Sequence, residues 1–217
     1  MLLLLLFFIC SISSTGCQGN IGKNVMNTPS EKCSEQLEKQ LLELDYAAIF
    51  MHLGGDKLKL INQQYAIACF EQLVLDEKAS SKARFFAAEI LFAQNQAIIL
   101  TFDKNKLAEL YALALANNDT GIANPWGLPG EVDVVGQHLL TISQPTTEAW
   151  EALLDNKQKV LYVGSEEATV GNSYKYRVKD IAAFYVSKMR NLPYTVFNKP
   201  KERDTEIIRL KNSLELK

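Results

Sequence analysis

The polar side chains best suited to binding or catalysis gather between residues 164 and 177. The candidate binding residues of this segment are Glu166, Glu167, Asn172, Tyr174 and Arg177. Its two adjacent carboxylates could act in general acid–base catalysis only if one had a raised pKa in a site closed to water. The alternative is structural: Ser165 caps a short helical turn with the acids at its positive end, and Arg177 pairs locally.

A second candidate is Trp126, which lies in the loop 124–130, with the sequence NPWGLPG. Proline and glycine at these positions disfavour a regular element. On a backbone stiffened by proline, the indole could anchor a protein partner, because tryptophan is enriched in binding hot spots. It could instead fold back and fill the helical core. The sequence leaves both interpretations open.

Recognised catalytic and cofactor patterns are missing from the chain. Gly164-Ser165 lacks the flanking residues of a nucleophile elbow, and no glycine-rich phosphate-binding motif is present. His52 and His138 lie in unrelated segments, so we interpret both as structural or exposed. We therefore predict no catalytic residue, no metal site and no cofactor.

The composition is that of a globular protein rather than a disordered one. Of 217 residues, 47% are hydrophobic and 22% are charged, which is enough for one domain with a substantial core. The formal net charge is −2, and no dense run of Lys and Arg occurs. Because nucleic-acid binding depends on a clustered basic surface, we expect no nucleic-acid partner.

Residues 1–16 have the character of a signal peptide. They begin with an apolar run, MLLLLLFFICSI, that is too short to cross a bilayer as a stable anchor and has no polar face. The small residues that follow lead to Gly16-Cys17. This segment resembles a bacterial lipoprotein signal, in which the Cys after the cleavage site receives the lipid. The resemblance implies lipidation of Cys17 and a flexible tether over residues 17–27.

Lipidation of Cys17 would anchor the protein to a membrane of the bacterial cell envelope. Gln18 follows this cysteine, whereas an Asp there is associated with inner-membrane retention in enteric bacteria. The outer membrane is therefore favoured. The alternative is a secreted or periplasmic soluble protein.

Two cysteines, Cys33 and Cys69, would remain in the folded part of the mature chain. An oxidising envelope would allow them to pair, and closing this loop is worth about 4 kcal/mol in the chain-entropy model. The alternative is two buried free thiols, since cysteine is among the most buried residue types.

Hydrophobic positions recur at helical spacing along most of the chain. The predicted helices are 28–52, 56–75, 80–92, 104–116, 131–142, 146–155, 176–189 and 204–216. The one candidate strand, 159–163, has no partner. We predict an all-α fold in a single helical domain that covers residues 28–217.

Two of these helices share a pattern when Ala83 is aligned with Val178. Each then has a basic residue, two variable positions, Ala-Ala, one variable position and two large residues. This pattern resembles the inner helix of HEAT-like repeats of the phycobilisome-lyase type, and residues 146–155 resemble the outer helix of the second unit. The resemblance implies antiparallel helix pairs in an α-solenoid; the alternative is an irregular helical bundle. Residues 164–177 would be a long loop inserted between the two helices of this unit.

Helix pairs without a catalytic constellation favour a binding function. We expect an envelope lipoprotein, not an enzyme, that holds a protein or peptide partner on its helical surface or its two loops. One alternative is an envelope hydrolase or small-ligand-binding protein with its site at residues 164–177. Another is a structural spacer of the envelope. The sequence specifies no oligomeric state.

Overall fold

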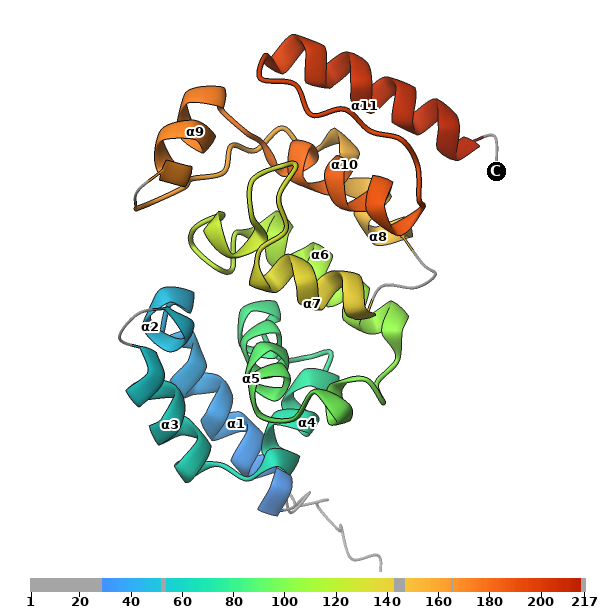
Figure 1. Ribbon diagram of the computed structural model, residues 1–217. Coiled ribbons are helices and arrows are strands. Elements are labelled where there is room, and N and C mark those ends of the chain that lie inside the picture. The colour runs from blue at the N-terminus through green and yellow to red at the C-terminus, as the bar shows by residue number, and fades with distance from the viewer. Residues whose placement is uncertain (1–28, 52–53, 143–146, 165, 216–217) are drawn as a thin grey trace, which may run out of the picture.

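The computed structural model describes residues 29–51, 54–142, 147–164 and 166–215, and these form an all-α fold (Figure 1). The predicted fold class is therefore confirmed. The predicted signal peptide, Cys17 and tether lie outside the described residues. The α-helices are α1 (Pro29–Leu42), α2 (Tyr46–Phe50), α3 (Gly54–Gln64), α4 (Ile67–Leu75), α5 (Ser81–Ile99), α6 (Lys104–Asn117), α7 (Val134–Ile142), α8 (Glu148–Glu151), α9 (Glu166–Tyr174), α10 (Val178–Met189) and α11 (Pro200–Glu215). Short 3-10 helices span Asn124–Trp126 (η1) and Ala152–Asp155 (η2).

Several predicted elements differ in their boundaries. The first predicted helix is two helices, because Asp45 caps α2 by accepting a hydrogen bond of 2.6 Å from the backbone nitrogen of Ala48. The second is divided into α3 and α4, with Ala66 in an extended conformation between them. The candidate strand is an extended segment whose one bridge within the described residues joins Lys159 to Arg177. This candidate therefore forms no strand, in agreement with the predicted all-α fold.

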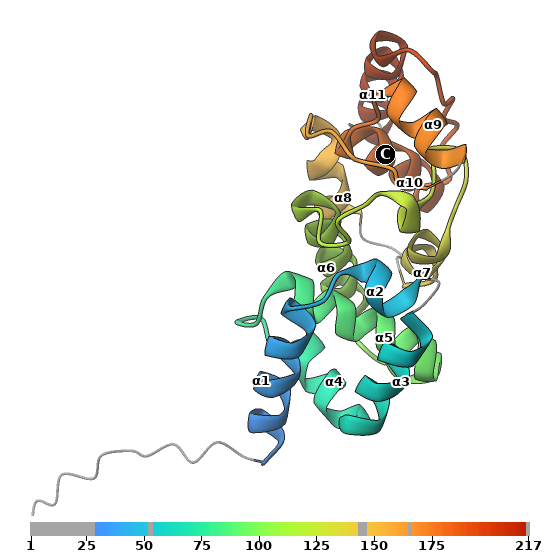
Figure 2. The ribbon, with the colours of Figure 1, turned by 90° about the vertical axis from the view of Figure 1, so that its left-hand side faces the viewer.

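The helices are stacked along one axis, with α1 and α3 at one end and α11 at the other (Figures 1 and 2). At the N-terminal end α1, α4 and α5 pack together, and α2 packs on α3. Contacts of α5 with α6, α6 with α8, and α10 with α8 and α11 continue the stack. Within the described residues, no helix is both long and apolar enough to cross a bilayer.

The alanine pairs of α5 and α10 lie in the core, as their spacing indicates. Ala87, Ala88, Ala182 and Ala183 are all fully buried. Small side chains let neighbouring helices approach closely: α5 packs on α4, and α10 packs on α8 and η2. This arrangement is compatible with paired helices, and their assignment to HEAT-like repeats stays a prediction.

A disulfide joins α1 to α4. Its residues are Cys33 and Cys69, whose Cα atoms are 5.8 Å apart. This is within the usual range for a disulfide of about 4.4–6.8 Å. Of the two alternatives for these cysteines, the structure therefore has the paired one.

Candidate functional site

Residues 164–177 contain a helix, so the prediction of a long open loop was wrong. Glu166 and Glu167 begin α9, and their side chains lie outside the described part of the structure. The ring of Tyr162 packs against this helix at Gly171, where a Cβ would overlap the ring. Glycine is unfavourable inside a helix in general, but here its missing side chain makes room for an aromatic ring.

Asn172 is committed to the backbone of the neighbouring extended segment. Its Oδ1 accepts from the nitrogen of Tyr162 at 3.1 Å, and its Nδ2 donates to the oxygen of Tyr162 at 2.8 Å. Asn124 does the same for Val163, over distances of 2.9 and 2.8 Å. Both side-chain amides thus replace a missing partner strand, and this is a structural role.

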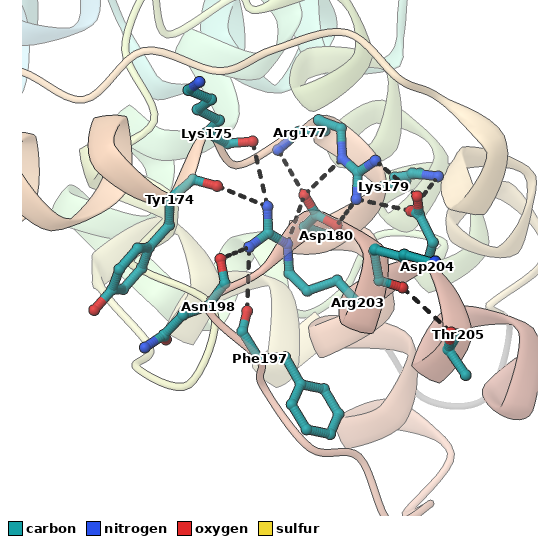
Figure 3. A network of polar contacts seen from close by, with 11 residues as sticks. Tyr174, Lys175, Arg177, Lys179, Asp180, Phe197, Asn198, Arg203, Asp204 and Thr205 are labelled. Carbon is teal, nitrogen blue, oxygen red and sulfur yellow. Dashed lines mark hydrogen bonds and ion pairs between the residues drawn. The ribbon is translucent and has the colours of Figure 1, made fainter.

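Arg177 belongs to an ion-pair network that joins α10 to α11 (Figure 3). Its Nη2 lies 2.8 Å from carboxylate oxygens of both Asp180 and Asp204. Asp180 is fully buried and also contacts Nε of the buried Arg203 at 3.2 Å. The sequence interpretation in which Arg177 pairs locally describes its contact with Asp180, whereas the contact with Asp204, 27 positions away, and the part played by Arg203 were not predicted.

Tyr174 takes part in the same region through its backbone. Its carbonyl oxygen accepts a hydrogen bond of 2.8 Å from Nη2 of Arg203, while the guanidinium of Arg203 lies 4.7 Å from the centre of the Tyr176 ring. The Tyr174 ring packs edge-on against Tyr176 at 5.9 Å. These residues anchor α11 to the rest of the fold.

Trp126 lies in the aromatic core, which is the second of its two sequence interpretations. Only 1% of the residue is exposed, so the indole is not available to a partner. The indole is surrounded by four aromatic rings at centroid distances of 5.7, 6.0, 6.2 and 6.5 Å, those of Trp150, Phe85, Tyr111 and Tyr185. The loop around it is pinned by the Tyr185 hydroxyl, which donates to the backbone oxygen of Trp126.

The candidate site that the sequence did not reveal is centred on Glu89 of α5. Only 1% of the Glu89 side chain is exposed to solvent. The hydroxyl of Tyr46 on α2 donates to it at 3.1 Å, and the hydroxyl of Tyr111 on α6 donates to its other oxygen. His138 on α7 places Nδ1 3.0 and 3.1 Å from the two oxygens. One carboxylate thus binds side chains from three other helices.

The protonation of the two tyrosines follows from their surroundings. Burial and, after it, the charge of Glu89 raise the pKa of Tyr46 and the pKa of Tyr111 far above the ordinary value of 10.0. Both hydroxyls therefore remain protonated and donate to Glu89. The Phe92 ring stacks on the imidazole of His138, with ring centres 4.1 Å apart and an angle of 1° between the ring planes.

A pocket of about 440 Å³ opens beside this cluster. Its ionisable groups are the carboxylates of Glu89 and Asp133 and the imidazole of His138. The apolar walls come from residues of α2, α3, α5 and α7, together with Pro125 and Met51. Asp133 is exposed and accepts a 2.6 Å hydrogen bond from the nitrogen of Val134 at the start of α7. An apolar pocket with a few convergent polar groups is the common form of a small-molecule site.

One feature of the sequence could have pointed to Glu89. It is the one charged residue between Phe85 and Phe92, a stretch of α5 that is otherwise apolar and buried. A charge in such a stretch requires partners, since an unpaired buried carboxylate is strongly unfavourable. Nothing local identifies these partners, because they come from positions 22 to 49 residues away.

The described residues contain no group of three or more His, Cys, Asp and Glu side chains arranged to hold a metal ion. Comparisons with family models, with curated proteins and with solved structures each found no match to this chain.

Proposed function

We propose that this protein is an envelope lipoprotein that binds a small, partly apolar molecule in the pocket between α2, α5 and α7. The observation that carries the proposal is the buried Glu89, bound by Tyr46, Tyr111 and His138 at the side of a pocket of about 440 Å³. A buried carboxylate is costly unless hydrogen bonds satisfy its oxygens. An apolar residue at position 89 could stabilise the core equally well, so stability alone does not explain the presence of this charge.

The protein would carry the lipid anchor predicted at Cys17, and its binding site would be the pocket rather than the two segments predicted from sequence. The loop sites predicted from sequence are less suitable, because Trp126 is buried and both Asn172 and Arg177 bond within the fold. A protein or peptide partner remains an expectation from the sequence alone. A site on the wall of a tethered domain suits a receptor or carrier for small molecules in the envelope.

The test uses N-phenyl-1-naphthylamine, a neutral dye that fluoresces in apolar sites. Ala93 is exposed, lines the pocket and follows Glu89 by one helical turn, so Ala93→Trp should fill the pocket. Ala97 is also exposed on α5 but does not line the pocket, and Ala97→Trp is the matched control. We expect saturable dye binding to the wild type and to Ala97→Trp, with a loss of at least tenfold in Ala93→Trp. Equal binding by all three proteins would refute the proposal.

A further inference from the structure

We infer that the molecule taken up by this pocket is an organic amine: an apolar body carrying a protonated nitrogen that retains N–H groups. The inference rests on the proposed function, since it names the ligand class of the same pocket. It follows from the hydrogen-bonding character, the charge and the aromatic content of the pocket wall, which are three separate observations.

Most polar groups at the pocket are acceptors. Nδ1 of His138 faces both oxygens of Glu89 and therefore carries a proton; in the tautomer with its proton on Nδ1, Nε2 is left as an acceptor. Tyr46 lines the pocket and already gives its hydroxyl proton to Glu89, so its oxygen can only accept a further hydrogen bond. A complementary ligand must supply donors.

Asn124 is the wall residue that can supply a donor, but most of its amide is committed to Val163, which leaves a single N–H of Nδ2. Its Nδ2 donates to the backbone oxygen of Val163 at 2.8 Å, while its Oδ1 accepts from the nitrogen of the same residue. A ligand carboxylate or phosphate would therefore meet few donors in this pocket.

The charge of the wall is negative. Glu89 and Asp133 are its carboxylates, and none of its described lining residues is Lys or Arg. Two carboxylates without a cationic counterpart favour a positive ligand and disfavour a negative one.

Aromatic rings complete the match to a cation. Tyr46 and Phe50 both line the pocket, with ring centres 4.6 Å apart. A cation over such ring faces is stabilised by roughly 0.5–2 kcal/mol. The remaining wall, from Ile49, Leu58 and Val134, is apolar and suits a hydrocarbon body.

The test measures how well four molecules with the same six-carbon chain displace N-phenyl-1-naphthylamine from the full-length protein. Hexylammonium has charge and donors, hexyltrimethylammonium has charge alone, hexanol is neutral, and hexanoate is negative. We expect hexylammonium to displace the dye at least tenfold better than hexanol, hexyltrimethylammonium to fall between them, and hexanoate to be the weakest. Hexylammonium that is no better than hexanol overturns the inference, whatever the absolute affinities.

Two variants locate the selectivity. Asp133→Asn retains a side-chain oxygen that can accept from the nitrogen of Val134 but removes one charge, and we expect it to weaken hexylammonium binding about fivefold with hexanol binding unchanged. His138→Leu removes the Nε2 acceptor and should abolish the advantage of hexylammonium over hexyltrimethylammonium. If both variants kept the preferences of the wild type, the assigned roles of these wall groups would be contradicted.

The proposed function and the ligand class can fail separately. If Ala93→Trp blocks dye binding but the wild type shows no preference for the amine, only the ligand class is refuted. If Ala93→Trp does not affect dye binding, both are refuted.

Discussion

His138 and Glu89 are 49 positions apart in the chain, and Nδ1 of the histidine lies within 3.1 Å of both carboxylate oxygens. The contact joins α7 to α5 and turns the imidazole edge toward the pocket. It also completes the set of donors that allows Glu89 to be buried. Stability and the shape of the candidate site therefore depend on the same carboxylate.

The first prediction concerns Tyr111, whose hydroxyl donates to Glu89 in the core. Tyr111→Phe should lower the free energy of unfolding by about 2 kcal/mol, because a buried charge loses a donor. In a Glu89→Leu background the same substitution should change it by less than about 0.5 kcal/mol, since no charge remains to be satisfied. Urea denaturation of the four proteins measures both values. An equal loss in the two backgrounds would show that the hydroxyl does not act through Glu89.

The second prediction concerns Arg203, which is 1% exposed beside the fully buried Asp180. Arg203→Met should destabilise the fold by about 3 kcal/mol or more, because it leaves the carboxylate with fewer partners and frees backbone oxygens that the guanidinium binds. Lys211→Met is the control, since Lys211 pairs with the exposed Asp155. Its urea midpoint should match that of the wild type. Similar midpoints for both variants would contradict the assigned importance of the buried pair.

The third prediction concerns the disulfide between Cys33 and Cys69, which are 36 positions apart. A loop of this length is worth about 4 kcal/mol in the chain-entropy model. A variant with both cysteines replaced by serine should therefore unfold at markedly lower urea concentration than the oxidised wild type. Reduction of the wild type should give a similar decrease and should leave the double-serine variant unaffected. A midpoint insensitive to reductant in the wild type would show that the bond contributes little.

The fourth prediction concerns pH and Asp204. Burial acts to raise the pKa of this carboxyl, but hydrogen bonds from Arg177 and Lys179 outweigh it and hold the pKa below its ordinary value of 3.8. A lowered folded-state pKa gives stability that is present above the unfolded value and is lost as pH falls through the folded value. Stability should therefore decline below about pH 4, and less so in Asp204→Asn. Urea midpoints at successive pH values test this; equal declines in both proteins would contradict it.

The fifth prediction concerns the lipid anchor predicted at Cys17, which lies outside the described residues. Cys17→Ser should move the protein from the membrane fraction to the soluble fraction, because the acyl chains supply the membrane affinity. Cell fractionation followed by immunoblotting measures the distribution, and Cys10→Ser should leave it unchanged. Retention of the Cys17→Ser protein in the membrane fraction would rule out Cys17 as the anchor.

The helical class and several helix positions could be read from the sequence. The apolar spacing from Val178 to Met189 predicts α10, and the alanine pairs predict which faces are buried. These features depend on residues three or four positions apart, which face the same side of a helix whatever surrounds it. The lengths of the N-terminal helices were less predictable, because a single capping residue such as Asp45 can end one helix and begin another.

Tertiary packing explains why some residues with low helix propensity lie in helices. Gly171 and Asn172 are poor helix formers, yet both lie in α9, where the first accommodates the Tyr162 ring and the second binds the Tyr162 backbone. Long-range packing also determined that Trp126 faces the core rather than solvent. Neither outcome follows from the residues beside these positions.

By itself, the sequence determined an all-α chain and the buried faces of its central helices, while the membrane anchor at Cys17 stays a prediction. Only the tertiary structure brought Glu89, Tyr46, Tyr111 and His138 to one point and placed a pocket beside them. The reason is physical: helical periodicity is set by neighbours along the chain, whereas a buried carboxylate is satisfied by whichever helices pack against it.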